Sequence, residues 1–375
     1  MKKIAMVTVH RTLNYGTMLQ TFACASLFKE YGFDTQVVDY YREKDYKESD
    51  FTDLRSYISA RRRISGHNGF VSNFILLGKS ILSYRATKRF FMLCSTFLKR
   101  NIHTTAPYYS YEDLRSTMPV ADYYCAGSDQ IWNTDYNGGI NPFYFLEFAG
   151  DKPNKFSFCS SIGKTELGAK EKKVIKEQLS SFKAISVREK SAKELLDSLG
   201  IKATDLIDPT LIRDSAFWSK MCSKRLITQP YLLIYKLKSN DTIDKIATQI
   251  AKEKGLKIVR VSFDDIHGIR GETSFVLPKI SEFLSLIKYA DYVVTNSFHG
   301  TCFSINFNRQ FLAVPREKYN TRIENILAKL NAIERLYSTD KSIKDICSHC
   351  DYIRINEKLE QERKIAKQWL REVLI

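Results

Sequence analysis

The chain has no apolar run long enough to cross a bilayer and few of the residues that mark low-complexity protein. No stretch of 18 consecutive apolar residues occurs, and 16 Gly and 8 Pro in 375 residues exclude collagen-like and linker-like compositions. The first ten residues contain too few apolar positions for a signal peptide, so we interpret them as a core strand. A hydrophobic content of 44% with 13% aromatics is typical of a globular protein. We therefore expect a soluble, cytoplasmic protein.

The sequence also lacks a disulfide framework and a zinc-binding pattern. Its eight cysteines are scattered, and several, such as Cys24, Cys125 and Cys302, fall inside predicted strands or helices, as small buried hydrophobes of a reducing compartment do. The pair Cys347 and Cys350 has C-x-x-C spacing but no second ligand pair at zinc spacing. We predict no metal site.

Acidic residues are missing from residues 54–111, which carry most of the excess behind a net charge of +16. Ten basic residues lie in this stretch among clusters of Phe, Leu and Ile: Arg55, Arg61, Arg62, Arg63, Lys79, Arg85, Lys88, Arg89, Lys99 and Arg100. The pattern is typical of basic amphipathic helices, which attract anionic lipid headgroups or polyanionic substrates. A solvated basic insertion, spanning about residues 43–118, is the alternative. A nucleic-acid-binding protein is disfavoured, because the charge is confined to one insertion and no nucleic-acid motif accompanies it.

The chain is longer than one hydrophobic core usually supports, so we expect two domains. Strand and helix patterns alternate through both halves, which predicts an α/β fold. Residues 208–210 (DPT) break the alternation, and it restarts near residue 231. We place the N-terminal domain at residues 1–208, the C-terminal domain at 209–355, and a closing charged helix at 356–375.

The pattern around residues 291–307 is the most informative in the chain. An apolar strand over residues 292–294 is followed by the capping side chains of residues 295–297 and by aromatics at helical spacing. His299 and Gly300 then lie at a helix N-terminus, where free N–H groups and the helix dipole favour an anion. Because histidine exchanges a proton near neutral pH, His299 is a candidate catalytic residue, although a structural histidine is the alternative.

Two further strand ends in the first half carry polar side chains. After the first strand, the turn at residues 14–20 (NYGTMLQ) has one Gly and lacks the dinucleotide fingerprint, yet it directs Asn14, Thr17 and Gln20 toward a crevice. After a strand over residues 122–126, residues 127–133 (GSDQIWN) are suited to holding sugar hydroxyls, with Trp132 as a stacking face and Asp129 as a candidate base. A plain turn in the first case and an Asx turn with a core Trp in the second are the alternatives.

Arg188 follows a short buried strand over residues 184–187. An Arg in this position pairs with a carboxylate or binds an anionic ligand, because its guanidinium matches carboxylate and phosphate geometry.

With these segments assembled, the chain resembles the polysaccharide pyruvyl transferase family. Five pieces carry the resemblance in the family's order: residues 14–20, 127–133, 187–191 (VREKS), 208–210 and 295–300 (TNSFHG). Relatives often have an Arg two positions before the His, where this chain has Ser297. That difference moves the expected anion contact to Arg188.

The resemblance implies two Rossmann-like domains facing each other across a cleft, as in GT-B glycosyltransferases. It also implies transfer of a pyruvyl group from phosphoenolpyruvate to a surface polysaccharide sugar, on an acceptor that we expect to be lipid-linked, with no metal, nucleotide or other cofactor. The expected roles are His299 as general acid and Asp129 as base, with Arg188, Ser297, Gly300 and Thr301 on the donor and Asn14, Gly16, Thr17, Gln20, Ser128, Gln130 and Trp132 on the acceptor.

Besides the nucleic-acid-binding protein, two other functions compete with this hypothesis. A GT-B nucleotide-sugar glycosyltransferase would share the architecture and a sugar acceptor, and the fold alone does not separate the two. A non-catalytic sugar-binding module is disfavoured only by the presence of His299. We expect the basic stretch over residues 54–111 to recruit the lipid-linked acceptor at the anionic inner face of a membrane, by peripheral contact.

Overall fold

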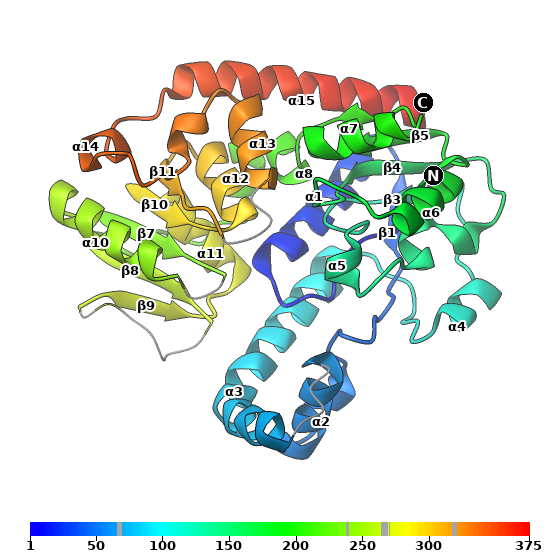
Figure 1. Ribbon diagram of the computed structural model, residues 1–375, viewed down its shortest axis with the longest axis horizontal. Coiled ribbons are helices and arrows are strands. Elements are labelled where there is room, and N and C mark those ends of the chain that lie inside the picture. The colour runs from blue at the N-terminus through cyan, green and yellow to red at the C-terminus, as the bar shows by residue number, and fades with distance from the viewer. Residues whose placement is uncertain (66–69, 238–239, 264–268, 270, 317–320) are drawn as a thin grey trace.

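In the computed structural model, which describes residues 1–65, 70–237, 240–263, 269, 271–316 and 321–375, the chain folds into two α/β domains (Figure 1). Each domain is built on a parallel sheet with helices on its faces. The predicted α/β fold class is confirmed. One long helix, α15 (Tyr352–Leu374), runs along one side of both domains.

The first sheet has the strand order β2-β1-β3-β4-β5-β6 among the described residues, and every pairing is parallel. Its central strands β3 and β4 are buried at every position, as expected when helices cover both faces. The strands are β1 (Lys3–Val7), β2 (Asp34–Val37), β3 (Tyr123–Ala126), β4 (Lys155–Ser160), β5 (Ala184–Val187) and β6 (Thr204–Asp205).

The second sheet has the order β11-β10-β7-β8-β9, again parallel throughout the described part. Its strands are β7 (Tyr231–Tyr235), β8 (Lys257–Ser262), β9 (Thr273–Val276), β10 (Tyr292–Thr295) and β11 (Gln310–Ala313). The edge strand β9 was not predicted from the sequence. Its residues are only partly buried, so it lacks the apolar run that marks the inner strands.

Apart from α15 and the two longer helices of the basic insertion, the helices of the described residues fall into three groups. In the first domain and the connection that follows it they are α1 (Tyr15–Glu30), α4 (Tyr111–Ser116), α5 (Thr134–Asn137), α6 (Ala169–Leu179), α7 (Lys190–Ser198), α8 (Pro209–Ile212) and α9 (Ser215–Ser219). In the second they are α10 (Asp241–Lys254), α11 (Ile280–Lys288), α12 (Phe298–Asn306), α13 (Thr321–Lys329) and α14 (Ile343–Ile346). Short 3-10 helices are η1 (Glu48–Phe51), η2 (Pro142–Phe145), η3 (Glu147–Ala149) and η4 (Ile333–Arg335).

The predicted basic insertion forms a helical hairpin of α2 (Leu54–Ser65) and α3 (Phe70–Asn101), and its far end projects away from both sheets (Figure 1). The second half of α3 packs into the main core, where Phe90 contacts Tyr15 of α1. Tyr57 of α2 packs among Phe51, Tyr84 and Phe91, which gives the hairpin a small aromatic core of its own. In the described part of the chain, no helix combines the length and apolar character needed to cross a bilayer.

Contacts at the N-terminus of α1 join the two domains. The Tyr15 ring stacks on Phe283 of α11 at 4.4 Å between centroids, and its hydroxyl donates a hydrogen bond to the Pro278 carbonyl at 2.6 Å. Burial of an aromatic pair with its hydroxyl satisfied stabilises the contact beyond the area removed from water. The start of α1 is therefore held against the second domain.

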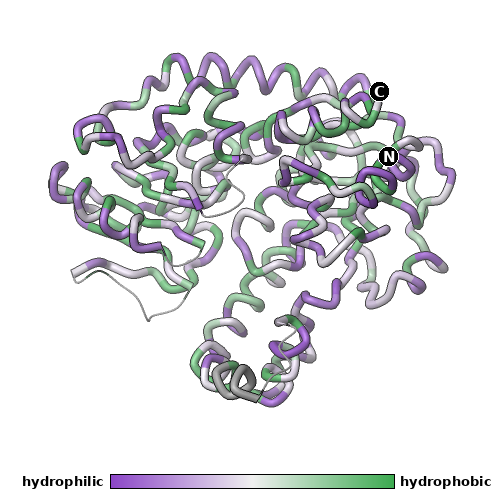
Figure 2. Tube along the Cα trace, viewed as in Figure 1, coloured by the Kyte–Doolittle hydropathy of each residue, from purple (hydrophilic) through white to green (hydrophobic). Residues whose placement is uncertain are grey.

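The helix α15 closes the molecule by returning to the first domain. Figure 2 shows hydrophilic and hydrophobic residues alternating along it, and its apolar side includes Leu359, Trp369 and Leu370. Trp369 stacks on Phe158 of β4, and the Leu374 carbonyl accepts a hydrogen bond from Tyr123 at 3.3 Å. The predicted domain boundary at 208/209 falls between β6 and β7, and the predicted closing helix at 356–375 overlaps α15, which begins four residues earlier and ends at Leu374.

Candidate active site

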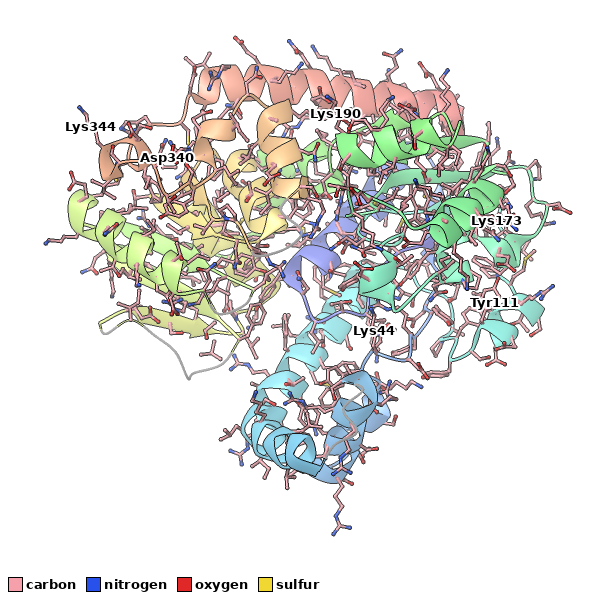
Figure 3. All side chains as sticks on the ribbon, in the orientation of Figure 1. Lys44, Tyr111, Lys173, Lys190, Asp340 and Lys344 are labelled. Carbon is pink, nitrogen blue, oxygen red and sulfur yellow. The ribbon has the colours of Figure 1, made fainter. Side chains whose placement is uncertain are left out.

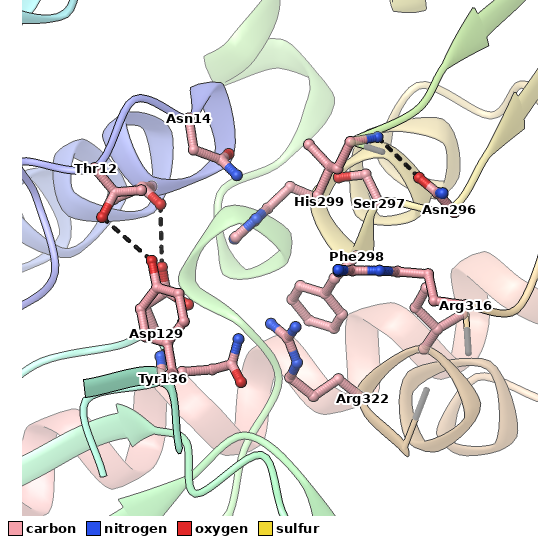
Figure 4. Close-up of a pocket in the computed structure, with 14 residues that line it drawn as sticks. Thr12, Asn14, Asp129, Tyr136, Asn296, Ser297, Phe298, His299, Arg316 and Arg322 are labelled. Atoms are coloured by element: carbon pink, nitrogen blue, oxygen red, sulfur yellow. Dashed lines mark hydrogen bonds between the residues drawn. The ribbon is translucent and has the colours of Figure 1, made fainter. Parts of the chain in front are cut away.

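A cavity of about 220 Å³ lies where loops and helix starts from the two domains meet (Figure 4). The strands of both sheets are parallel, so the segments that follow their carboxyl ends converge here. From the first domain the lining residues are Thr12, Asn14, Thr17, Asp129, Gln130 and Tyr136. From the second domain they are Leu237, Asn296, Ser297, Phe298, His299, Arg316, Arg322 and Ile323.

His299 is placed by the strand-to-helix turn that the sequence predicted. The strand β10 ends at Thr295, and Ser297 caps α12 by accepting a hydrogen bond from the Gly300 N–H at 3.2 Å. Asn296 fixes the turn to the neighbouring strand by accepting a hydrogen bond from the Leu237 N–H at 3.0 Å. His299 thus lies in the first turn of a helix with its ring in the cavity (Figure 4).

Gly16 brings the first domain close to the imidazole of His299. A Cβ atom at position 16 would overlap the His299 ring, with Nδ1 as its nearest atom. Gly16 follows the cap residue Asn14, whose Oδ1 accepts a hydrogen bond from the Gly16 N–H at 2.8 Å. Two helix N-termini therefore approach each other across His299, and only glycine allows the approach.

The imidazole is buried without a hydrogen bond to its Nε2 atom. His299 is 6% exposed, and Nε2 lies 3.9 Å from Asp208 Oδ2, beyond hydrogen-bond distance. Burial lowers the pKa of His299 to about 4, although the carboxylates of Asp208 and Asp129 oppose this effect and Arg188 adds to it. At neutral pH the ring is uncharged and can accept a proton.

Behind His299, Arg188 is surrounded by three carboxylates. Its side chain is fully buried, donates to Asp208 at 2.7 Å and to Asp129 at 3.0 Å, and lies 3.9 Å from Glu189. Its guanidinium also lies 4.8 Å from the Phe298 ring centroid. Arg188 is outside the cavity lining. This geometry disfavours direct contact of Arg188 with a donor anion, because Asp129 and Asp208 accept hydrogen bonds from its two terminal nitrogens and only its buried Nε atom has no partner.

Asp129 lines the cavity and is ionised. Its carboxylate accepts hydrogen bonds from Thr17 at 3.2 Å and from the Gln130 N–H at 2.9 Å, in addition to the Arg188 ion pair. Although burial opposes ionisation, the positive charge of Arg188 outweighs it and holds the pKa of Asp129 at about 2. Asp129 has a left-handed φ of 77°, an unfavourable conformation that directs its side chain toward the cavity.

Three of the seven predicted acceptor residues line the cavity, and the other four, Gly16, Gln20, Ser128 and Trp132, do not. Asn14, Thr17 and Gln130 face the cavity. Gln20 is fully buried and donates to Thr8, and Ser128 is fully buried beside Asp208.

The predicted stacking role of Trp132 is wrong in this structure. The indole is 1% exposed, stacks on Phe145 and donates to the Tyr144 carbonyl at 3.1 Å. Trp132 therefore supports the turn at residues 127–133 from the core, as its alternative interpretation stated.

Gly300 and Thr301 also support the site from behind. The Gly300 N–H is taken by Ser297, and a Cβ at this position would approach Thr295 and Tyr235 too closely. Thr301 is fully buried and returns both its N–H and its hydroxyl to the Ser297 carbonyl. The predicted contacts of their N–H groups with a donor are thus replaced by contacts within the helix.

Sequence reasoning missed two arginines that line the cavity, Arg316 after β11 and Arg322 in α13. A signal for Arg322 existed, because a cation in the first turn of a helix opposes the helix dipole. Asp208 was recognised only as part of a motif, yet it pairs with Arg188 and caps α8. Among the described residues, no cluster of three or more His, Cys, Asp and Glu side chains is arranged to hold a metal ion.

The fold is similar to that of UDP-N-acetylglucosamine 2-epimerases. The enzyme from Rickettsia bellii is 14% identical with a TM-score of 0.55, and the match covers 100% of this chain and 96% of that one. The enzyme from Neisseria meningitidis bound to UDP-GlcNAc is 9% identical with a TM-score of 0.50, covering 100% and 99%. At these identities the likeness concerns the fold alone. It confirms the predicted GT-B-like arrangement of two facing Rossmann-like domains.

Comparison of sequences identifies the family. None of the curated protein sequences compared with this chain matches it. A family model described as polysaccharide pyruvyl transferase matches residues 14–318, which include all five motifs and the cavity residues Asp129, His299 and Arg316. The chain therefore belongs to the polysaccharide pyruvyl transferase family.

Proposed function

We propose that the protein transfers the pyruvyl group of phosphoenolpyruvate to two hydroxyls of one sugar in a surface polysaccharide precursor, forming a cyclic ketal. The observation that carries the proposal is the convergence of His299, an ionised Asp129 and an unpaired Arg322 in one small cavity. A cavity of about 220 Å³ is smaller than the ~300–1,000 Å³ typical of drug-sized ligands. It suits a small anionic donor better than a nucleotide sugar.

The reaction needs one group that accepts and returns a proton. Two hydroxyl oxygens form bonds to C2 of the donor, and the C2–O bond to phosphate breaks with its electron pair going to phosphate. Of the two hydroxyl protons, one is added to the methylene carbon, which becomes a methyl group, and the other leaves with the phosphate. We assign this proton exchange to His299, which is neutral in the protein alone and can accept a hydroxyl proton before donating it to carbon.

Asp129 then has the supporting role. With a pKa of about 2, its carboxylate is a weaker base than the imidazole of His299, with a pKa of about 4, but it can accept a hydrogen bond from the sugar. Where relatives often have an arginine, this chain has Ser297. Two arginines from other segments, Arg316 and Arg322, line the same cavity and can supply the positive charge instead.

The test of this function compares donors directly. We expect phosphoenolpyruvate to raise the thermal midpoint of the protein, since a ligand that binds only the folded state stabilises it. A panel of UDP-, GDP- and CDP-sugars should give no comparable shift. Release of phosphate from phosphoenolpyruvate in the presence of extracted lipid-linked glycans provides the activity measurement. Stabilisation by a nucleotide sugar but not by phosphoenolpyruvate would instead identify a glycosyltransferase.

We also propose that the hairpin of α2 and α3 docks on anionic lipid, bringing the enzyme to a lipid-linked acceptor. One side of α3 exposes Ile81, Leu82, Arg85, Arg89 and Met92, which recur at helical spacing. The apolar members are 54%, 72% and 53% exposed, respectively. Exposed apolar side chains among arginines favour a lipid surface, because the arginines meet headgroups while the apolar groups enter the interface.

Replacing Lys79, Arg85 and Arg89 with Gln is expected to reduce binding to vesicles that contain anionic lipid. Each basic residue near such a surface contributes about 1 kcal/mol, so the loss should exceed tenfold at low salt and be smaller at physiological salt. Co-sedimentation with vesicles of graded anionic content measures it.

The matched control for this variant removes equal charge from other surfaces. Lys173, Lys190 and Lys344 are exposed, and Figure 3 shows them on α6, α7 and α14, away from the hairpin. Their replacement with Gln should leave vesicle binding unchanged. Equal losses in both variants would mean that binding depends only on net charge and would rule out a hairpin dock.

A further inference from the structure

Arg322 is a buried cation without a counter-ion. It is 9% exposed and lines the cavity, and its Nε atom has no hydrogen-bond partner. Among the residues that the structure describes, no carboxylate lies within ion-pair distance of its guanidinium. The contact that the group does make is with the Phe298 ring, 5.5 Å from its centroid.

This position is unfavourable for a cation in the protein alone. Arg322 is the second residue of α13, so its charge lies at the positive end of the helix dipole. Burial lowers the pKa of Arg322 to about 10, the nearby charge of Arg188 adds to this effect, and the carboxylates of Asp129 and Glu189 oppose it only in part. The residue still carries its proton at neutral pH. A buried, unpaired charge is costly, and it is commonly retained where a ligand supplies the missing charge.

The carboxylates around the cavity act on Arg322 from a distance, but their hydrogen bonds go to other groups. Asp129 and Asp208 are bound to Arg188, and Glu189 accepts hydrogen bonds from Ser161 and Gly163. The two arginines share the Phe298 ring but differ in what surrounds them. The two terminal nitrogens of Arg188 are held by Asp129 and Asp208, and only its Nε atom lacks a hydrogen-bond partner. Arg322 has no carboxylate partner of this kind among the described residues and presents its guanidinium to the cavity on the side facing His299 (Figure 4).

From this arrangement we infer that Arg322 binds the phosphate group of the donor, taking the role predicted for Arg188. The inference rests on the proposed function for the identity of the donor. The guanidinium offers paired N–H groups that match two phosphate oxygens, and a phosphate dianion would supply the charge that α13 and Arg322 lack. The donor carbon would then lie between Arg322 and His299, which line the same cavity.

The test measures two properties of each variant: its affinity for anions and its thermal stability in the absence of anions. Arg322→Met is expected to weaken binding of phosphoenolpyruvate and of inorganic phosphate by about 10- to 100-fold, the usual effect of losing a charge-assisted contact. The same variant should unfold at an equal or higher temperature than the native chain in the absence of anions, because an unpaired buried charge is removed. Arg322→Lys should retain part of the binding. Titration calorimetry and thermal unfolding measure both.

Arg354→Met is the matched control, since Arg354 is exposed and pairs with Glu334 on the surface. It removes the same charge and should leave binding unchanged.

If Arg322→Met bound phosphoenolpyruvate as tightly as the native chain, the inference would be wrong while the proposed function would stand. If pyruvate but not phosphate competed for the site, Arg322 would hold the carboxylate and the phosphate assignment would fail. If the native chain bound phosphate but not phosphoenolpyruvate, the proposed donor would be wrong and the phosphate site would stand.

Discussion

Replacing His299 with Ala is expected to reduce pyruvyl transfer by about 10²- to 10⁴-fold, the usual contribution of a positioned proton-transfer group. Stability should change little, because two effects oppose each other. The substitution removes a buried ring nitrogen that has no hydrogen bond, which favours folding, and it leaves a small cavity, which disfavours it. Steady-state kinetics measure the loss of rate, and urea unfolding measures the change in stability. A loss of only a few-fold in rate would exclude His299 from proton transfer.

The pH dependence distinguishes the two directions of that transfer. In the protein alone the pKa of His299 is about 4, so the neutral ring predominates above this pH. If the ring first accepts a hydroxyl proton, kcat/KM should fall as the pH drops toward 4 and should be insensitive to His299 near neutrality. If the ring had to be protonated first, kcat/KM would instead fall as the pH rises above 4.

Gly16→Ala provides a positional variant that leaves the imidazole in the chain. The new methyl group would overlap the His299 ring, so the ring must move while the helix gains a better helix former. We expect the rate to fall by at least about tenfold, since small misplacements at a reacting centre have large effects. Gly78→Ala, in an open position on α3, is the control and should not change the rate.

The parts of the site that the sequence predicted are those set by neighbouring residues. The buried strand ending at Thr295, the cap at Ser297 and the position of His299 follow from a few consecutive residues, because capping and helix start are local properties. The same holds for Asn14 at the start of α1.

The parts that it missed depend on contacts between distant segments. Arg188 follows β5, and its partners Asp129 and Asp208 lie 59 and 20 residues away along the chain. Periodicity shows that Arg188 follows a buried strand, but it does not show which carboxylates reach it. For the same reason the pattern could not tell whether Trp132 faces the cavity or the core, since both positions are compatible with a buried strand end.

Arg188→Met is expected to lower the free energy of unfolding by about 3–5 kcal/mol at pH 7.5, because removing one partner of a buried ion pair leaves uncompensated charge. In this protein the loss leaves Asp129 and Asp208 buried without their common cation. Arg188→Lys keeps the charge but cannot reproduce both contacts of the guanidinium, so its loss should be intermediate. Urea unfolding at fixed protein concentration gives the three values.

The dependence of that loss on pH identifies its cause. In the native chain the pKa of Asp129 is about 2 and that of Asp208 is also lowered, so both carboxylates stabilise the fold above the unfolded value of about 3.9 and lose this effect as the pH falls below it. Without Arg188, the largest effect that lowers the two pKa values is lost, and Arg322, His299 and hydrogen bonds from Gln130 and Thr210 still oppose burial. We expect burial then to raise both pKa values above the unfolded one. The folded variant then binds protons more tightly than the unfolded chain, so acidification stabilises it. The difference in the free energy of unfolding between the variant and the native chain should therefore shrink as the pH falls from 7.5 toward 4.

Adding Asp208→Asn to Arg188→Met should recover part of the loss at pH 7.5, because one of the two unpaired charges is removed. A difference that stayed constant with pH, or that Asp208→Asn enlarged, would mean that Arg188 stabilises the fold by packing against Phe298 rather than by balancing the two carboxylates.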